Sequence, residues 1–213
     1  IDLALQTRIE QMVATQARSL PADTQVAAAV IDIASGELVA LVGSVDPTHP
    51  ASGQVDGAAA FRSPGSALKP FVYAAAMEAQ RLAPDSLVYD LPIQRGGWTP
   101  ANFSRGFAGE LSAAEALRKS LNVPAILVAE GTGLDRCIRA IESAGVRFQT
   151  DAARRGGLGV VVGAVEVRLL DLTNAYATLG RGGIFRELSL FTDQRGEERR
   201  VLSADACAAV SDI

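Results

Sequence analysis

Lysine, histidine, aromatic residues and long apolar runs are all scarce in this chain of 213 residues. Lys69 and Lys119 are its only lysines among 20 basic residues, His49 is its only histidine, and aromatic residues make up 5%. The formal net charge is −4 and no basic stripe with interleaved aromatic residues is present, so nucleic acid is not an expected partner. The longest weakly polar stretch, 156–167, is too short to cross a bilayer.

The few cysteines and the lone histidine also limit the chemistry. Cys137 and Cys207 stand far apart in apolar, alanine-rich surroundings, which is typical of small buried residues rather than of a disulfide or a catalytic thiol. His49 lies in a proline-flanked loop, and no cluster of metal-ligating residues is visible around it. We therefore expect no metal, no cofactor and no catalytic triad that uses histidine.

The composition, 48% apolar and 21% charged, is that of a folded domain, and apolar spacing predicts both helices and strands. We expect a β-hairpin at 26–42 with its turn at 34–36. Helices are expected at 2–19, 66–80, 112–119, 124–131, 135–144, 166–179 and 203–213, a further strand at 184–190, and a long irregular loop at 84–110.

A serine and a lysine lie three residues apart where one of these helices should begin. The sequence Ser-Ala-Leu-Lys occupies 66–69, so Ser66 and Lys69 share one helix face, one turn apart. The helix N-terminus favours negative charge developing on the serine oxygen, and a lysine amine held neutral can accept the hydroxyl proton. This pattern is typical of a serine acyl-transferase without a histidine base. A capping serine followed by a solvated lysine would give the same four residues.

A second pattern, Ser-Leu-Asn at 120–122, lies between two predicted helices. In a tight turn the hydroxyl of Ser120 and the amide of Asn122 project the same way. The serine can then relay a proton to a leaving nitrogen, and the asparagine can hold a substrate peptide group. Taken alone, this turn is equally well an Asx- or ST-turn without a chemical function, and Lys119 is expected to be a solvated charge at a helix end.

Together the two patterns resemble, in order and spacing, the active-site motifs of penicillin-recognising serine enzymes. The flanking segments resemble the transpeptidase domain of penicillin-binding proteins, in particular the bifunctional class A members of the 1C type; these segments are 1–6, 61–71, 98–103, 109–125 and 170–183. The resemblance implies a mixed α+β fold, with a mainly antiparallel sheet beside a helical cluster. It also implies an interdomain junction helix at 1–20 and the N-terminal and central part of a transpeptidase domain at 21–213.

The resemblance assigns a function to each motif residue. Ser66 would be the nucleophile that is acylated by the D-Ala-D-Ala end of a peptidoglycan stem peptide or by a β-lactam, and its backbone N–H would supply half of the oxyanion hole. Lys69 would be its base, and Ser120 would pass the proton to the leaving group. Asn122 would hydrogen-bond the acyl donor.

The resemblance also implies further partners and a location. Trp98 and Asn102, in the second similar block, would be additional substrate-binding residues. The chain begins at Ile1 without a signal peptide, so we expect an excerpt of a longer protein. Its membrane anchor and glycosyltransferase domain would precede this excerpt, and the domain would face the periplasm at the inner membrane.

The third motif of the family, Lys-Ser/Thr-Gly, is absent from these 213 residues. In the family it comes after a helix like the one expected at 203–213, so the chain is expected to stop just before it, which leaves the activity of this piece open. Two alternatives remain. A serine β-lactamase or β-lactam sensor shares the first motif, although Leu121 stands where class A β-lactamases have aspartate and Glu166 has no assigned function. The other alternative is a non-catalytic peptidoglycan- or partner-binding module with an incomplete site.

Overall fold

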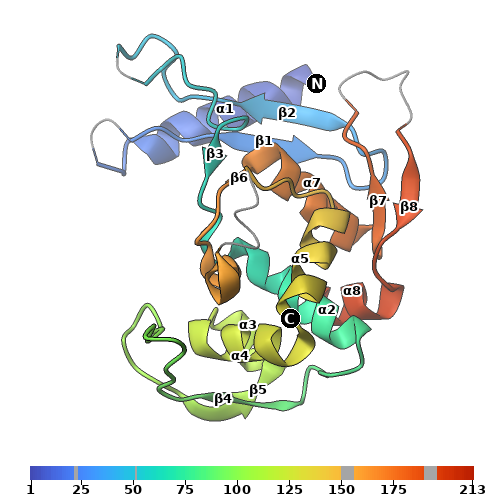
Figure 1. The fold of residues 1–213 in the computed structure, drawn as a ribbon. Helices are drawn as coiled ribbons and strands as arrows, with labels where there is room; N and C mark the ends of the chain where they lie inside the picture. Colours follow the sequence, from blue (N-terminus) through green and yellow to red (C-terminus); the bar gives the residue numbers. More distant parts are fainter. Residues whose placement is uncertain (22–23, 51, 150–155, 190–195) are drawn as a thin grey trace.

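The computed structural model describes residues 1–21, 24–50, 52–149, 156–189 and 196–213 (Figure 1). The helices are α1 (Leu3–Ala17), α2 (Lys69–Glu78), α3 (Ala113–Arg118), α4 (Asn122–Thr132), α5 (Leu134–Ser143), α7 (Leu169–Gly180) and α8 (Ala204–Ser211). The strands are β1 (Ala28–Ile31), β2 (Leu38–Val42), β3 (Phe61–Arg62), β4 (Leu87–Asp90), β5 (Gly109–Ser112), β6 (Val167–Arg168), β7 (Ile184–Arg186) and β8 (Glu198–Arg200). The 3-10 turns η1 (Gly65–Leu68) and η2 (Gly157–Val162) complete the described elements.

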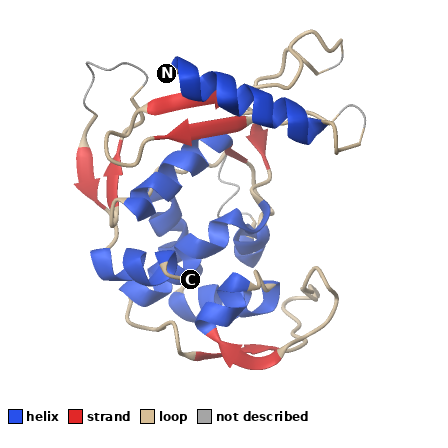
Figure 2. Cartoon of the chain, turned by 180° about the vertical axis from the view of Figure 1, so that it is seen from behind, coloured by secondary structure: helices blue, strands red, loops and turns tan. Residues whose placement is uncertain are grey.

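The β1–β2 hairpin forms a layer between α1 on one side and α7 on the other (Figures 1 and 2). Asp2 caps α1, because its carboxylate accepts the N–H groups of Ala4 and Leu5. The Gln6 side chain on α1 bonds both the carbonyl and the N–H of Leu41 at 2.8 Å, which ties the helix to β2. The helix and the hairpin predicted for this region are thus confirmed.

The core lies in a helical cluster around α2, which packs against α4, α5 and α8. Leu68 and Phe71 are completely buried, as are the residues that follow on α2 through Ala74. A helix buried all round contributes most of its stability through packing rather than through local propensity. Cys137 on α5 and Cys207 on α8 are buried and free, as predicted.

The strands that the structure describes form four separate two-stranded antiparallel sheets: β1–β2, β3–β6, β4–β5 and β7–β8. The mixed α+β class is confirmed and the pairing is antiparallel, although the strands form pairs rather than one wide sheet. The β3–β6 pair joins the segment before 66–69 to the segment before α7, so it brings together two parts of the chain that are far apart in sequence.

Several predicted boundaries are wrong. The region 84–110, predicted to be irregular, holds β4 and the beginning of β5. These strands pair antiparallel, with Leu87 opposite Ser112 and Asp90 opposite Gly109. The helix expected at 166–179 begins only at Leu169, because the two residues before it pair with β3. The strand expected at 184–190 ends at Arg186, and its last predicted residue lies outside the described residues. Among the described helices, none is both long enough and apolar enough to span a membrane.

Candidate active site

The first motif lies where the chain changes from a 3-10 turn to an α-helix. Ser66 stands in η1, and Lys69 is the first residue of α2. Pro70 follows in the first turn, where its missing N–H costs no helical hydrogen bond. Ser66 is exposed, whereas Lys69 is only 1% exposed. The candidate nucleophile therefore faces solvent, and the candidate base is buried one turn away.

A close backbone contact fixes the residue before Ser66. Gly163, just after η2, has a φ of +89°, and a Cβ there would lie 2.5 Å from Gly65 Cα. The Ser63 hydroxyl donates to the Gly163 carbonyl at 2.7 Å. Only glycine fits this position, because a side chain would push the Gly65 backbone and the neighbouring Ser66 away. Sequence reasoning missed this contact, since nothing local marks Gly163 as a neighbour of the first motif.

Tyr176 on α7 holds the residue after Ser66. Its hydroxyl donates to the Ala67 carbonyl at 2.9 Å. Its ring meets Phe71 edge to face with centroids 5.3 Å apart, which orients the phenol. The Ser66 backbone is therefore supported on both sides, by Gly163 and by Tyr176, from elements about 100 residues away in sequence.

The second motif forms the turn between α3 and α4. The Ser120 N–H donates to Leu117 O at 2.8 Å and the Leu121 N–H donates to Ala116 O at 3.0 Å, which is the Schellman ending of a helix. Ser120 occupies the left-handed position of this ending with a φ of +54°, where glycine is normally preferred. The predicted turn is confirmed. The strained conformation at Ser120 could not be predicted, because the sequence offers no glycine there.

The structure brings Lys69 and the second motif into direct contact. Lys69 Nζ donates to Ser120 O at 2.5 Å, to Asn122 Oδ1 at 2.7 Å and to Ser120 Oγ at 3.3 Å. These three acceptors match the three N–H bonds of an ammonium group, so none is left for Ser66 Oγ. The two motifs, about 50 residues apart in sequence, therefore form one site.

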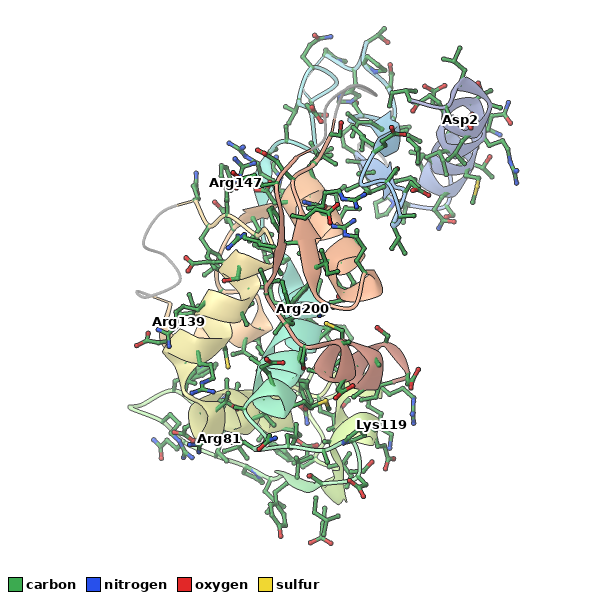
Figure 3. The ribbon with its side chains drawn as sticks, turned by 90° about the vertical axis from the view of Figure 1, so that its right-hand side faces the viewer. Asp2, Arg81, Lys119, Arg139, Arg147 and Arg200 are labelled. Atoms are coloured by element: carbon green, nitrogen blue, oxygen red, sulfur yellow. The ribbon has the colours of Figure 1, made fainter. Side chains whose placement is uncertain are left out.

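Burial decides the protonation of this lysine. Desolvation lowers the pKa of Lys69 to about 8, from an ordinary value of 10.5. At pH 7 about a tenth of the amine is then neutral and able to take a proton. Lys119 is different: it forms an ion pair with Glu115 at 2.6 Å, and its side chain is 53% exposed at the edge of the molecule (Figure 3). Its predicted place as a solvated helix-end charge is confirmed.

The structure corrects the expectation for Asn102 and leaves that for Trp98 open. Asn102 is only 5% exposed, and both ends of its amide are bonded inside the protein: Nδ2 donates to Asp90 and Oδ1 accepts from the Asn122 N–H. It therefore has no group left to face a substrate. Trp98 is 38% exposed in a turn closed by two backbone hydrogen bonds with Arg95, and its substrate contact stays a prediction.

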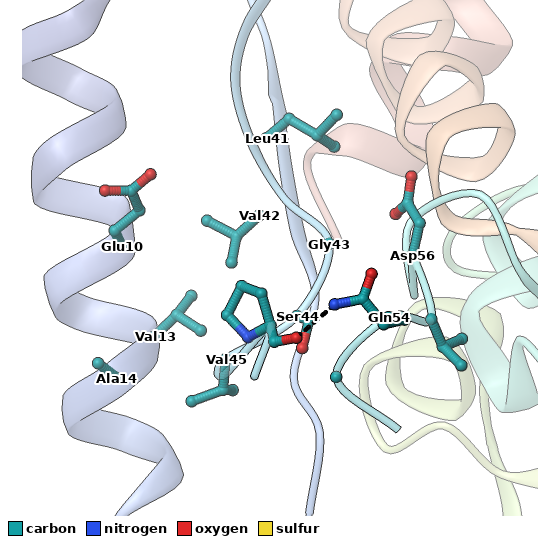
Figure 4. A pocket seen from close by; sticks show the side chains of 13 residues that line it. Glu10, Val13, Ala14, Leu41, Val42, Gly43, Ser44, Val45, Gln54 and Asp56 are labelled. Carbon is teal, nitrogen blue, oxygen red and sulfur yellow. Dashed lines mark hydrogen bonds between the residues drawn. The ribbon is translucent and has the colours of Figure 1, made fainter. Parts of the chain in front are cut away.

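A separate pocket of about 530 Å³ lies between α1, β2 and the loop after β2 (Figure 4). Val13, Leu41, Ser44 and Gln54 are among its lining residues, and none of the predicted site residues borders it. The described residues contain no group of three or more histidine, cysteine or acidic side chains that could hold a metal ion.

A helix-start serine beside a buried lysine, with a Ser-x-Asn turn closed onto that lysine, is the arrangement expected of a penicillin-recognising serine enzyme. The chain belongs to the penicillin-binding protein transpeptidase family, whose model "Penicillin binding protein transpeptidase domain" matches residues 26–213. The family inferred from the sequence is thus confirmed.

Two curated relatives are penicillin-binding proteins of the 1C and 1A types. Penicillin-binding protein 1C of Escherichia coli K12 is 34% identical over 207 residues, which cover 97% of this chain and 27% of that protein. Penicillin-binding protein 1A of Pseudomonas aeruginosa is 35% identical over 130 residues, 58% of this chain and 15% of that protein. The chain thus spans about a quarter or less of the length of these relatives.

Solved structures share the fold. The transpeptidase domain of penicillin-binding protein 3 from Burkholderia pseudomallei matches all of this chain and 67% of its own, with a TM-score of 0.80 and 20% identity. PonA1 from Mycobacterium tuberculosis in complex with penicillin V matches 94% of this chain and 59% of its own, with a TM-score of 0.73 and 22% identity.

Proposed function

We propose that this chain carries the acylation centre of a peptidoglycan D,D-transpeptidase, which forms a serine acyl-enzyme with D-Ala-D-Ala stem peptides and with β-lactams. The observation that carries the proposal is the contact of Lys69 with both Ser120 and Asn122, one turn from the exposed Ser66. Family membership and the E. coli 1C relative support the same function.

In the proposed reaction, the neutral Lys69 amine takes the hydroxyl proton as Ser66 Oγ attacks the carbonyl carbon of the penultimate D-Ala. The Ser66 backbone N–H, at the start of a helix, stabilises the developing oxyanion. When the C–N bond breaks, the Ser120 hydroxyl passes the proton from Lys69 to the departing nitrogen, so free D-Ala leaves and an ester remains on Ser66. An amine of a neighbouring stem peptide then attacks the ester and regenerates the serine.

Asn122 would orient the acyl donor in this scheme. Its Oδ1 accepts from Lys69, and its Nδ2 donates to the Ala101 carbonyl at 2.8 Å, leaving one N–H for a substrate carbonyl. Trp98 is exposed and lies three residues before Ala101 in the sequence, and we retain it as a proposed substrate contact.

We further propose that residues 1–20 form the junction to an upstream glycosyltransferase domain, and that 21–213 form the N-terminal and central part of a transpeptidase domain. The family model, which begins at residue 26, and the length of the E. coli relative support this division. The parent protein would be anchored in the inner membrane with this domain in the periplasm. The Lys-Ser/Thr-Gly motif would come after these residues and supply the second oxyanion donor.

The test is intact-mass analysis after incubation with a reporter penicillin, performed on this chain and on the longer protein. We expect a covalent adduct that disappears in Ser66→Ala and persists in the matched control Ser211→Ala, which removes another exposed serine. An adduct retained in Ser66→Ala, or no adduct on either form, would overturn the proposal. Rapid hydrolysis of the adduct would favour the β-lactamase alternative instead.

A further inference from the structure

The N-terminus of α4 has no cap from its own sequence. Leu121 stands at the capping position without a polar side chain, and Pro124 in the first turn has no N–H. The acceptor comes instead from a loop 20 residues earlier, where Asn102 Oδ1 accepts the N–H of Asn122 at 2.8 Å and that of Val123 at 3.5 Å. Asn102 thus performs for α4 what a local serine or aspartate performs for most helices.

A buried carboxylate fixes the orientation of this amide. Asn102 Nδ2 donates to both oxygens of Asp90, at 2.8 and 2.9 Å, and to the Gly106 carbonyl at 2.9 Å. Asp90 is completely buried and also accepts the Ala108 N–H at 2.7 Å. Because all the donors of the amide are used on this side, its oxygen must face α4.

The same loop holds the side chain of the second motif. Asn122 Nδ2 donates to Ala101 O, next to Asn102, while Asn122 Oδ1 accepts from Lys69. An unbroken path of hydrogen-bonded residues therefore runs from Asp90 through Asn102 and Asn122 to the amine of Lys69. Loss of the contact between Asp90 and Asn102 would let the Ser120–Asn122 turn move relative to Lys69.

Tyr73 brings α2 close to this path. It follows Lys69 by one helical turn. Burial is the main cause that raises the pKa of its hydroxyl, and the nearby charge of Asp90 is the second.

The energetic cost of burying Asp90 also needs an explanation. A completely buried carboxylate bonded to neutral donors is a poor way to add stability, because its desolvation offsets much of the gain. A geometric function explains its presence better.

We propose that Asp90 and Asn102 are positioning residues for the acylation of Ser66: together they cap α4 from outside and hold the Ser120–Asn122 turn against Lys69. The inference rests on the proposed function and adds two buried residues to it. Displacements of the order of 1 Å at a reacting site can cost about a hundredfold in rate. We therefore expect Asp90→Asn and Asn102→Ala each to lower the acylation rate constant about tenfold to a hundredfold.

The test measures acylation of the longer protein by a reporter penicillin, with the rate constant at saturation separated from non-covalent binding and expressed per folded molecule. The main loss is expected in the rate constant, because Lys69 and Ser120 act on the covalent step. The matched control is Asp171→Asn, another buried aspartate, whose partner Arg147 lies at 2.8 Å and takes no part in the path from Asp90 to Lys69. It should lose stability and keep its acylation rate constant.

The exchanged pair, Asp90→Asn with Asn102→Asp, separates positioning from simple destabilisation. It restores an acceptor for the Asn122 N–H and a donor–acceptor pair between 90 and 102, so we expect it to recover most of the rate lost by the single variants. Folded single variants with an unchanged rate constant, or an equal loss in Asp171→Asn, would overturn the inference. Absence of acylation in the wild type would instead refute the proposed function itself.

Discussion

Replacement of Lys69 by methionine removes a buried amine while keeping the length of the side chain, and it should change how stability depends on pH. The folded-state pKa of about 8 lies below the ordinary value of 10.5. Between these two values the unfolded chain holds a proton that the folded chain has released. The free energy of unfolding must therefore rise with pH in this window, whereas below pH 8 both states are protonated and the effect is constant.

The magnitude is set by the two pKa values. Their difference corresponds to about 3 kcal/mol over the whole window, because each tenfold change in proton affinity is worth about 1.4 kcal/mol. Between pH 7 and pH 9.5 the Lys69 contribution should amount to about 2 kcal/mol. Only 1% of the residue is exposed, so the lowered pKa reflects removal of the amine from water.

The assay is reversible urea denaturation of the wild type and of Lys69→Met at pH 7 and pH 9.5. The difference in unfolding free energy between the two proteins should change by about 2 kcal/mol in favour of the wild type at the higher pH. All other titrating groups are present in both proteins, so their contributions cancel in this difference. Lys119→Met, which removes an exposed amine, should follow the wild type. If the curves for wild type and Lys69→Met run parallel, the amine does not titrate in this window and Lys69 is not poised to act as the base.

Three further predictions concern backbone strain and burial around the site. Gly163→Ala places a Cβ against Gly65 and should destabilise the chain by about 1–3 kcal/mol and slow acylation, measured by urea titration and adduct formation. Ser120→Gly relieves a left-handed backbone, so it should stabilise the chain by about 1 kcal/mol yet slow acylation; faster acylation would contradict the proposed proton relay. Tyr73→Phe removes a hydroxyl that has no hydrogen-bond partner among the described residues and should raise stability by about 1 kcal/mol, whereas a large loss would reveal a hidden partner.

Local signals predict most of the helices because their causes lie within a few residues. Asp2, Ser112 and Ser203 each precede a helix and accept N–H groups from its first turn, as their positions in the sequence indicate. The first motif is also recognisable locally, since proline, glycine and the three-residue spacing of Ser66 and Lys69 mark a helix start.

The remaining errors have non-local causes. β3 and β6 are two residues long and pair across about 100 residues of chain, so neither has a periodicity that could be recognised. A substrate contact is expected for Asn102 only because it stands in the block 98–103 that resembles the family, whereas the structure buries its side chain, which is 5% exposed. Its burial depends on Asp90, whose own strand is hidden inside a region of irregular sequence pattern.

Three locally unfavourable features of the described chain meet around one point, and their convergence favours a catalytic explanation. Lys69 is a buried amine, Ser120 is a non-glycine residue in a left-handed conformation, and Asp90 is a buried carboxylate. Each lowers stability if considered alone, yet successive hydrogen bonds through Asn102 and Asn122 connect all three. A fold selected only for stability would replace these residues one at a time. Acylation, in contrast, needs a lysine with a lowered pKa and a Ser120–Asn122 turn that cannot move away from it.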